Sequence, residues 1–302
     1  MSIARALVTI AAAGLVLVGA LLFVPLWPCT LLEHFRVQYL LGGSVIVAAA
    51  FAFASRWFDA ALIALLVDLV AITSDLSATA HVKQGTPVRV LYANVLTSNT
   101  RHAELSALIA RTAPDVVALV ETDRTWFEAL APALAGYERI EYARNDNFGL
   151  ALYVRGTLEA NVEYPGGYLP AIVAHVTLSK GPQVSFVVAH PAPPITSEAE
   201  AHQHDTLAAI AARVGALRAP VVLAGDLNAT PWSRVFRKLV GTTGLCDTRA
   251  GFGYQGSFPA SSVVLRIPID HVLVSCDIGV ANRTLGPDVG SDHLPVIADL
   301  VF

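Results

Sequence analysis

Polar residues that could do acid–base or metal chemistry stand directly after apolar, strand-like runs in this sequence. Asn94 follows Val-Leu-Tyr-Ala, Glu121 follows Val-Val-Ala-Leu-Val, and His190 follows Phe-Val-Val-Ala. A buried strand that ends in such a residue delivers its side chain to one edge of a sheet. Each residue alone is typical of an ordinary turn, but the repetition favours one shared site.

Further polar residues border later apolar runs: Asp226 and Asn228, Asp270, and Asp292 with His293. In an extended segment Asp226 and Asn228 would share one face, and the same alternation turns His271 away from Asp270. Carboxylates suit a hard cation, and histidines suit proton transfer or phosphate binding. Asp270 is the candidate to orient His293.

The motifs resemble those of the endonuclease/exonuclease/phosphatase superfamily over residues 88–302. They occur in the family's order: Tyr-Ala-Asn94, Val-Glu121-Thr, Ala-His190-Pro, Gly-Asp226-Leu-Asn228, Ile-Asp270-His and Gly-Ser-Asp292-His293. Strand-like runs outnumber helical ones here, which by itself indicates two stacked sheets with helices outside. The resemblance implies an α/β four-layer sandwich of two mostly antiparallel sheets flanked by helices. It also implies divalent-metal-dependent hydrolysis of a phosphoester.

The resemblance implies the metal ligands. Glu121 corresponds to the chief ligand, with Asn94 and Asp292 close by. The ion expected is Mg²⁺ or Mn²⁺, because oxygen ligands suit hard cations and the sequence has no thiolate cluster. Abasic-site endonucleases carry an acidic residue two positions after the first Asn, where this chain has Leu96. That departure weakens a second metal site and a role in DNA repair.

The resemblance also implies the catalytic residues. Asp226 and Asn228 would hold water and the phosphate, His190 would stabilise its charge, and Asp270 would orient His293. Either Asp226 or His293 would be the general base, and both alternatives stay open. A catalytically inactive binding module on the same fold is the non-enzymatic alternative.

The front of the chain is apolar and contributes much of the mean hydropathy of +0.56. Residues 1–75 are expected to form a membrane anchor of three transmembrane helices at about 6–26, 37–55 and 57–73. The first two are close to the roughly 20 residues that a spanning helix needs; the third is shorter and carries Asp59 and Asp68. Residues 76–87 would be a linker. A cleaved signal peptide is the alternative for the first segment, but it does not explain the other two.

Basic residues give the expected orientation. Arg5 and Arg56 flank one side of the predicted spans and Arg36 the other, which places the first two in the cytoplasm. An odd number of spans then puts the catalytic domain outside the cell membrane. Asp68 would lie inside the third span, where a carboxylate is costly. It is either a packing contact between helices or a functional group.

Charge and linker length bear on the substrate. The chain has 20 Lys and Arg against 24 Asp and Glu, which disfavours a protein that tracks nucleic-acid phosphates. The basic group Arg234, Arg237 and Lys238 is interpreted as a solvated helix face. The short linker favours a phospholipid, a sphingolipid or a polyprenyl phosphate, the last by similarity to VanJ-like membrane-anchored members.

A nuclease acting on DNA or RNA is the alternative to the lipid-linked substrate. Because three apolar segments begin the chain, the lipid bilayer is the expected partner, and no protein partner is inferred.

The three cysteines, Cys29, Cys246 and Cys276, neither demand nor forbid one disulfide.

Overall fold

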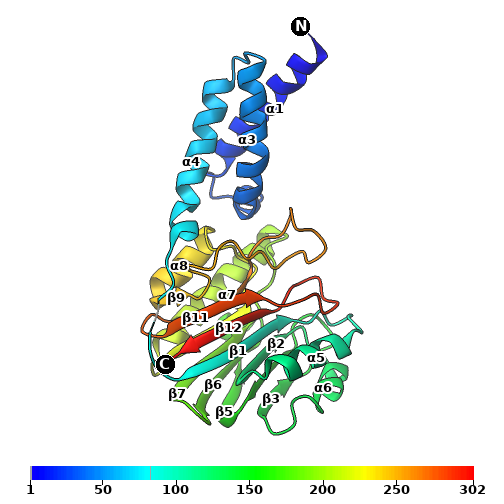
Figure 1. Cartoon of the computed structure of the whole chain (residues 1–302), viewed down its shortest axis with the longest axis vertical. Coiled ribbons are helices and arrows are strands. Elements are labelled where there is room, and N and C mark those ends of the chain that lie inside the picture. Colours follow the sequence, from blue (N-terminus) through cyan, green and yellow to red (C-terminus); the bar gives the residue numbers. More distant parts are fainter. Residues whose placement is uncertain (1, 82) are drawn as a thin grey trace.

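The computed structural model describes residues 2–81 and 83–302. A helical bundle stands at one end of a larger α/β domain (Figure 1). The N-terminal helices are α1 (Ile3–Leu21), α2 (Cys29–Leu32), the short 3-10 helix η1 (Glu33–Phe35), α3 (Arg36–Ala52) and α4 (Phe58–Ser77). We call α1, α3 and α4 the N-terminal bundle.

Small residues allow the three helices of the bundle to approach one another closely. Its buried centre is made by Ala12, Val47, Ala50 and Ala61. Many large apolar side chains point outward instead, such as Leu17, Val45 and Val70. Among the described residues, two helical stretches are long and apolar enough to cross a membrane, Ile3–Leu21 and Cys29–Ala52. The third expected span corresponds to α4, which contacts both α1 and α3.

An ion pair joins two helices of the bundle. Arg36 Nη1 donates to Asp68 Oδ1 at 2.5 Å, and both side chains are buried. Asp68 is therefore a contact between α3 and α4, as the packing interpretation of the sequence predicted.

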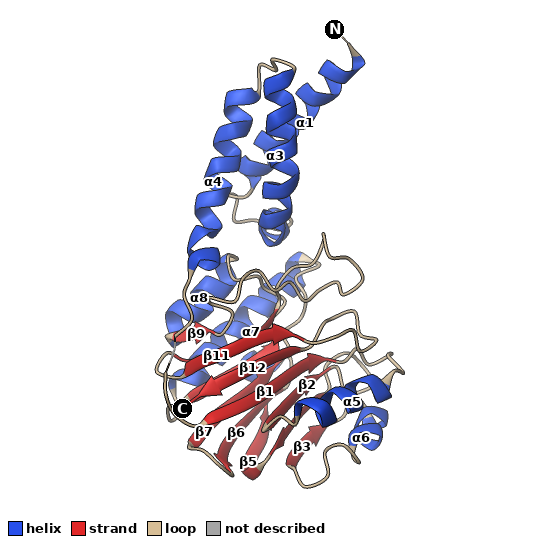
Figure 2. Ribbon diagram, in the orientation of Figure 1, coloured by secondary structure: helices blue, strands red, loops and turns tan. Residues whose placement is uncertain are grey.

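The α/β domain contains two six-stranded sheets (Figure 2). The first has the order β11 (Gly279–Leu285), β12 (Val296–Val301), β1 (Pro87–Asn94), β2 (Val116–Val120), β4 (Leu150–Val154) and β3 (Glu138–Tyr142). The second has the order β5 (Gly156–Glu163), β6 (Ala171–Leu178), β7 (Gln183–Ala189), β8 (Val221–Asp226), β10 (Asp270–Ser275) and β9 (Leu245–Asp247). Each sheet has one parallel pair, β1 with β2 and β7 with β8, and its other pairs are antiparallel.

Helices cover the outer face of each sheet, which confirms the expected sandwich with helices outside. Those on the first sheet are α5 (His102–Thr112) and α6 (Arg124–Leu130), and those on the second are α7 (Ser197–Gly215) and α8 (Arg234–Thr243); a 3-10 turn, η2 (Pro165–Gly167), lies beside α7. Alternate residues of β1 face opposite layers: Val90 packs between the sheets, whereas Leu91 packs under α5 and α6. Because both faces are covered, the central strands are apolar throughout.

The N-terminal bundle is attached to the domain through α8. Arg234 Nη2 donates to the carbonyl of Leu22, just after α1, at 2.5 Å, and Arg237 Nη2 donates to the carbonyl of Ala71 in α4 at 2.5 Å. The interpretation of this basic group as a solvated face is therefore wrong for the two arginines. The sequence could not show that backbone carbonyls of two other helical segments lie opposite them.

The loop between α1 and α3 also contacts the domain. Trp232 Nε1 donates to the carbonyl of Glu33 at 2.7 Å, and the Nδ1 atom of His34 lies 3.2 Å from Thr230 Oγ1. The connection between bundle and domain is thus more than a linker. In the linker region itself, α4 continues to Ser77 and β1 begins at Pro87.

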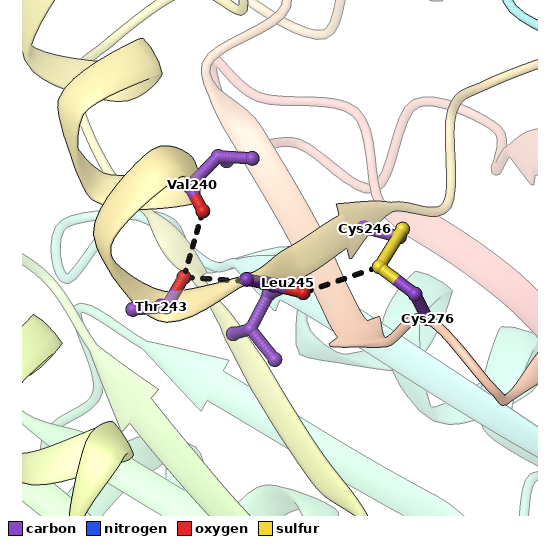
Figure 3. Close-up of a disulfide and its surroundings, with 6 residues drawn as sticks. Val240, Thr243, Leu245, Cys246 and Cys276 are labelled. Atoms are coloured by element: carbon purple, nitrogen blue, oxygen red, sulfur yellow. Dashed lines mark hydrogen bonds between the residues drawn. A yellow bond between two sulfur atoms is a disulfide. The ribbon is translucent and has the colours of Figure 1, made fainter.

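One disulfide closes the end of the second sheet (Figure 3). Cys246 in β9 is bonded to Cys276, which follows β10, with a Cα–Cα distance of 5.1 Å. Cys29 is a free thiol. The pairing that the sequence left open is therefore Cys246 with Cys276.

The ion pair of the bundle yields a stability prediction. Asp68→Leu should lower the melting temperature of the detergent-solubilised protein, because an unpaired Arg36 left in a buried position costs about 3–5 kcal/mol. Adding Arg36→Leu should recover most of that loss, since no buried charge then remains. Thermal unfolding of both variants measures this. A double variant as unstable as the single one would contradict the prediction.

Candidate active site

The side chains named from the sequence meet where the two sheets approach each other at one edge. Asn94 ends β1, Glu121 follows β2, His190 follows β7 and Asp226 ends β8. The parallel pairs β1–β2 and β7–β8 bring these ends to the same side. Asp270 begins the antiparallel strand β10 directly opposite Asp226. The strand-end pattern therefore reflects one site shared by both sheets.

Asn94 connects the carboxylates of the two sheets. Its Nδ2 atom donates to Glu121 Oε1 at 2.8 Å and to Asp226 Oδ2 at 3.2 Å. Its Oδ1 atom accepts from the backbone N–H of Leu96 at 3.1 Å, which fixes the orientation of the amide. Asn94 is thus held as a donor between two acids.

His190 lies beside the same two acids. Its Nε2 atom is 3.3 Å from Glu121 Oε1, and its Nδ1 atom is 3.1 Å from the carbonyl of Asp226. Burial alone would lower the pKa of His190, but the hydrogen bond to Glu121 and the charges of Glu121 and Asp226 raise it. In return, His190 and Asn94 hold the pKa of Glu121 below its usual value despite burial. The ring of Phe148 packs against His190 with centroids 5.4 Å apart.

His293 is paired with Asp270, as the sequence proposed. Its Nδ1 atom lies 2.8 Å from Asp270 Oδ2, and its Nε2 atom lies 3.6 Å from Asp226 Oδ2. Burial would lower the pKa of His293, but the charges of Asp270 and Asp226 raise it to about 10. Burial, with Asp270 nearby, raises the pKa of Asp226 to about 6. His293 therefore keeps its proton near neutral pH more readily than Asp226 does.

Asn228 approaches the site by a turn. β8 ends at Asp226, and Asn228 has a φ of +51°, so the expected extended segment with both side chains on one face is wrong. Asp226 Oδ1 accepts the backbone N–H of Asn228 at 2.9 Å, a bond within the turn that replaces strand pairing. The Asn228 side chain donates to the carbonyl of Pro191 at 2.9 Å. It thereby holds the segment that follows His190.

Asp292 and His271 lie apart from these groups. The Asp292 side chain is exposed and belongs to neither cluster of metal-capable side chains among the described residues. His271 is buried on the other side of β10, where its Nε2 atom lies 2.8 Å from the carbonyl of Ala229. Burial lowers its pKa to about 4. The alternation argument for His271 is confirmed.

The residues present fit a divalent cation. Glu121, His190 and Asp226 each offer one ligand atom, and these atoms lie within 4.8 Å of one another. Glu121 Oε2 is buried and has no hydrogen-bond partner among the described residues. Glu121 also adopts a φ of +60°, a conformation that non-glycine residues rarely take and that is common at functional sites. Two carboxylates and an imidazole form a donor set that suits a divalent cation.

Tyr92 is a site residue that the sequence argument missed. Its hydroxyl is buried without a hydrogen-bond partner among the described residues. Burial, together with the charges of Asp270, Asp226 and Glu121, raises its pKa well above the usual value. Tyr92 stands two residues before Asn94 on the same strand, so strand alternation would have placed it on the same face.

The model of the Endonuclease/Exonuclease/phosphatase family matches residues 91–293, from just before Asn94 to His293. This chain belongs to that family. Members of the family are metal-dependent phosphoester hydrolases, and the chain is an enzyme of this class. No curated protein sequence matches the chain significantly.

Solved structures share the fold of the domain. A family protein from Bacteroides thetaiotaomicron is 20% identical, with 73% of this chain and 99% of that chain covered and a TM-score of 0.61. The human Nocturnin catalytic domain, with a bound sulfate anion, is 18% identical over 74% and 95%, with a TM-score of 0.60. A mannosyl-6-phosphatase from Bacteroides thetaiotaomicron is 20% identical over 71% and 100%, with a TM-score of 0.56.

Substitutions at the centre of the cluster should abolish most of the activity. Glu121→Ala, Asp226→Ala and His293→Ala should each lower kcat by at least about 100-fold, the usual size for a general base or a charge-stabilising group. His271→Gln is the matched control, because it replaces a buried histidine outside the cluster. Initial rates on a soluble chromogenic phosphodiester measure both. Equal losses at His271 and His293 would contradict the assignment.

Asp270→Asn should lower the pKa of His293. The carboxylate of Asp270 is the main group that raises this pKa to about 10, and an amide carries no charge to replace it. NMR titration of imidazole-labelled protein in EDTA, which keeps metal ions away, follows the histidine directly. A His293 pKa that stays near 10 in the variant would show that another group sets it.

Proposed function

We propose that the protein is a membrane-anchored, divalent-metal-dependent phosphoesterase that hydrolyses a lipid-linked or membrane-proximal phosphoester. A phospholipid, a sphingolipid or a polyprenyl phosphate would be its substrate. The observation that carries this proposal is the contact of the loop between α1 and α3 with residues 230–234. That segment follows Asp226 and Asn228 directly, and its Thr230 and Trp232 contact His34 and Glu33. The catalytic edge would therefore lie close to the membrane surface.

The catalytic roles follow from the geometry of the cluster. Glu121, Asp226 and His190 would hold Mg²⁺ or Mn²⁺, which supplies positive charge to the phosphate oxygens and aligns water. His293, held by Asp270 at 2.8 Å, would donate a hydrogen bond from Nε2 to the phosphate. Either His293 or Asp226 would accept the proton of the attacking water, and Asp226 would do so through an oxygen that is not bound to the cation. Asn94 would keep the side chains of Glu121 and Asp226 in place.

The arrangement of the bundle supports three membrane crossings. Arg5 at the start of α1 donates to the carbonyl of Ala54 after α3 at 3.5 Å. These two ends therefore lie together, away from the domain, whereas Leu22 and Ala71 lie against it. Under the basic-residue rule, the end that carries Arg5 faces the cytoplasm.

The disulfide supports the same orientation. Disulfides persist in oxidising compartments and are rare in the cytosol, and the Cys246–Cys276 bond lies in the α/β domain. We therefore propose that the α/β domain lies outside the cell membrane and that residues 88–302 form the catalytic domain.

Metal removal and a substrate panel test the proposed reaction. Phosphoesterase activity of the detergent-solubilised protein should be abolished by EDTA and restored by Mg²⁺ or Mn²⁺. The panel comprises lipid phosphates, lipid pyrophosphates, sphingomyelin, plasmid DNA and RNA, and the lipid-linked phosphoesters should be turned over fastest. Full activity in EDTA would refute the metal mechanism, and preferential cleavage of DNA or RNA would favour a nuclease.

Reporter fusions and thiol counting test the orientation. Alkaline phosphatase fused after Phe302 should be active, and a fluorescent protein that folds only in the cytoplasm should be dark there. Denatured, unreduced protein from isolated membranes, lysed in acid to stop thiol exchange, should react with one maleimide-polyethylene glycol, at Cys29. Three reacting thiols and a bright fluorescent fusion would place the domain inside.

A further inference from the structure

Two loops near the catalytic edge carry exposed apolar side chains. Ile195 in the loop between β7 and α7 is 70% exposed, and Val263, Val264 and Leu265 in the loop before β10 are 77%, 68% and 52% exposed. We call these four residues the apolar rim. Contiguous exposed apolar groups, unlike single apolar residues, mark interaction sites, and three of these four residues are consecutive in the sequence.

Both loops are tied to the N-terminal bundle. Trp27 Nε1 donates to the carbonyl of Pro194 at 3.1 Å, directly before Ile195. Gln38 Nε2 donates to the carbonyls of Val264 and Arg266 at 3.1 and 2.9 Å. Gln38 lies in the first turn of α3, inside the candidate span Cys29–Ala52. The apolar rim therefore lies at the level at which that span begins.

The picture of the whole chain agrees with these contacts. In Figure 1 the orange loops between β9 and β10 rise from the α/β domain on the side that carries the bundle. In this view their tip reaches the height of the lower end of the bundle. Their tip is thus directed toward the layer that the helices would cross.

The same loops lead directly to catalytic side chains. Ile195 lies five residues after His190. At the base of the other loop, the ring of Phe258 packs against His293 with centroids 4.7 Å apart. The backbone N–H of Ala260 donates to the carbonyl of Asp292 at 2.7 Å. Each of the two loops is therefore continuous in sequence with a residue that belongs to the catalytic cluster or packs against it.

We propose that the apolar rim inserts into the interface of the bilayer that the N-terminal bundle crosses. This rests on the membrane anchoring proposed above. All four side chains are aliphatic and uncharged, which suits the boundary between lipid headgroups and acyl chains. We expect these side chains to contact the bilayer because their loops are hydrogen-bonded to Trp27 and Gln38, near the points at which the helices would enter the membrane. The substrate is then an amphiphile whose phosphoester lies at headgroup depth and is cleaved without leaving the membrane.

Site-directed spin labelling of the full chain tests the insertion. In a Cys29→Ser background, Val264→Cys carries the nitroxide label, and Lys180→Cys is the control. Lys180 is exposed in the turn before β7, at the opposite end of the strands from the catalytic edge. Both proteins are reconstituted into vesicles of phosphatidylethanolamine and phosphatidylglycerol. Power saturation then compares collisions with oxygen, which concentrates in lipid, and with a water-soluble nickel chelate.

The label at Val264 should have an oxygen-to-nickel collision ratio severalfold higher than the label at Lys180. A ratio equal to that at Lys180 would overturn the insertion, and so would a label shielded from both reagents, which would indicate a protein contact. This readout needs no activity, so it stands or fails separately from the proposed reaction.

Activity then shows whether insertion serves catalysis. The triple variant Val263→Ser, Val264→Ser, Leu265→Ser should turn over a phospholipid in vesicles at least about tenfold more slowly than the unsubstituted protein, because polar side chains do not hold the loop in the interface. Its turnover of soluble bis(p-nitrophenyl) phosphate should be unchanged, since none of the three residues belongs to the catalytic cluster. Equal losses on both substrates would overturn the role assigned to the rim.

Discussion

Three carboxylates, Glu121, Asp226 and Asp270, are buried together where the edges of the two sheets meet. Like charges in such a place repel one another strongly, and burial alone disfavours each of them. The protein offsets this with donors placed between the acids. Asn94 bridges the first two, and His293 pairs with the third. Glu121 Oε2 is left without a donor among the described residues, and that remaining demand for positive charge is what a bound cation would meet.

The architecture follows from the need to deliver these groups to one place. Asp226 and Asp270 come together because β8 and β10 are antiparallel and pair at these residues. Asn94 and Glu121 come together because β1 and β2 are parallel and end on the same side. Each sheet contains one parallel pair, which brings two strand ends to the site, and its other pairs are antiparallel. Helices on the outer faces then keep the central strands dry, which strengthens the electrostatic contacts at their ends.

The sequence predicted the parts of the fold that are buried on both faces. Apolar runs marked β1, β2, β7 and β8, and the polar residues at or just after their ends marked the site. It missed the edge strands β3, β5, β9 and β11, which carry exposed residues such as Glu138 and Glu159. Asn228 was misplaced because a turn begins where the strand was assumed to continue. The contacts of Arg234 and Arg237 join segments more than 160 residues apart, and no local pattern encodes such a pairing.

Those long-range contacts change what the N-terminal helices do for the catalytic domain. A flexible tether would hold the domain near a membrane while leaving its orientation free. Here hydrogen bonds from α8 meet the ends of α1 and α4, and His34 contacts Thr230 directly. Because these contacts come from different helices, rotating the domain relative to the bundle would break several of them together. The position of the catalytic residues, at the ends of β1, β2, β7 and β8, is therefore fixed relative to the bundle by the fold. The substrate must reach them without passing through the contacts between bundle and domain.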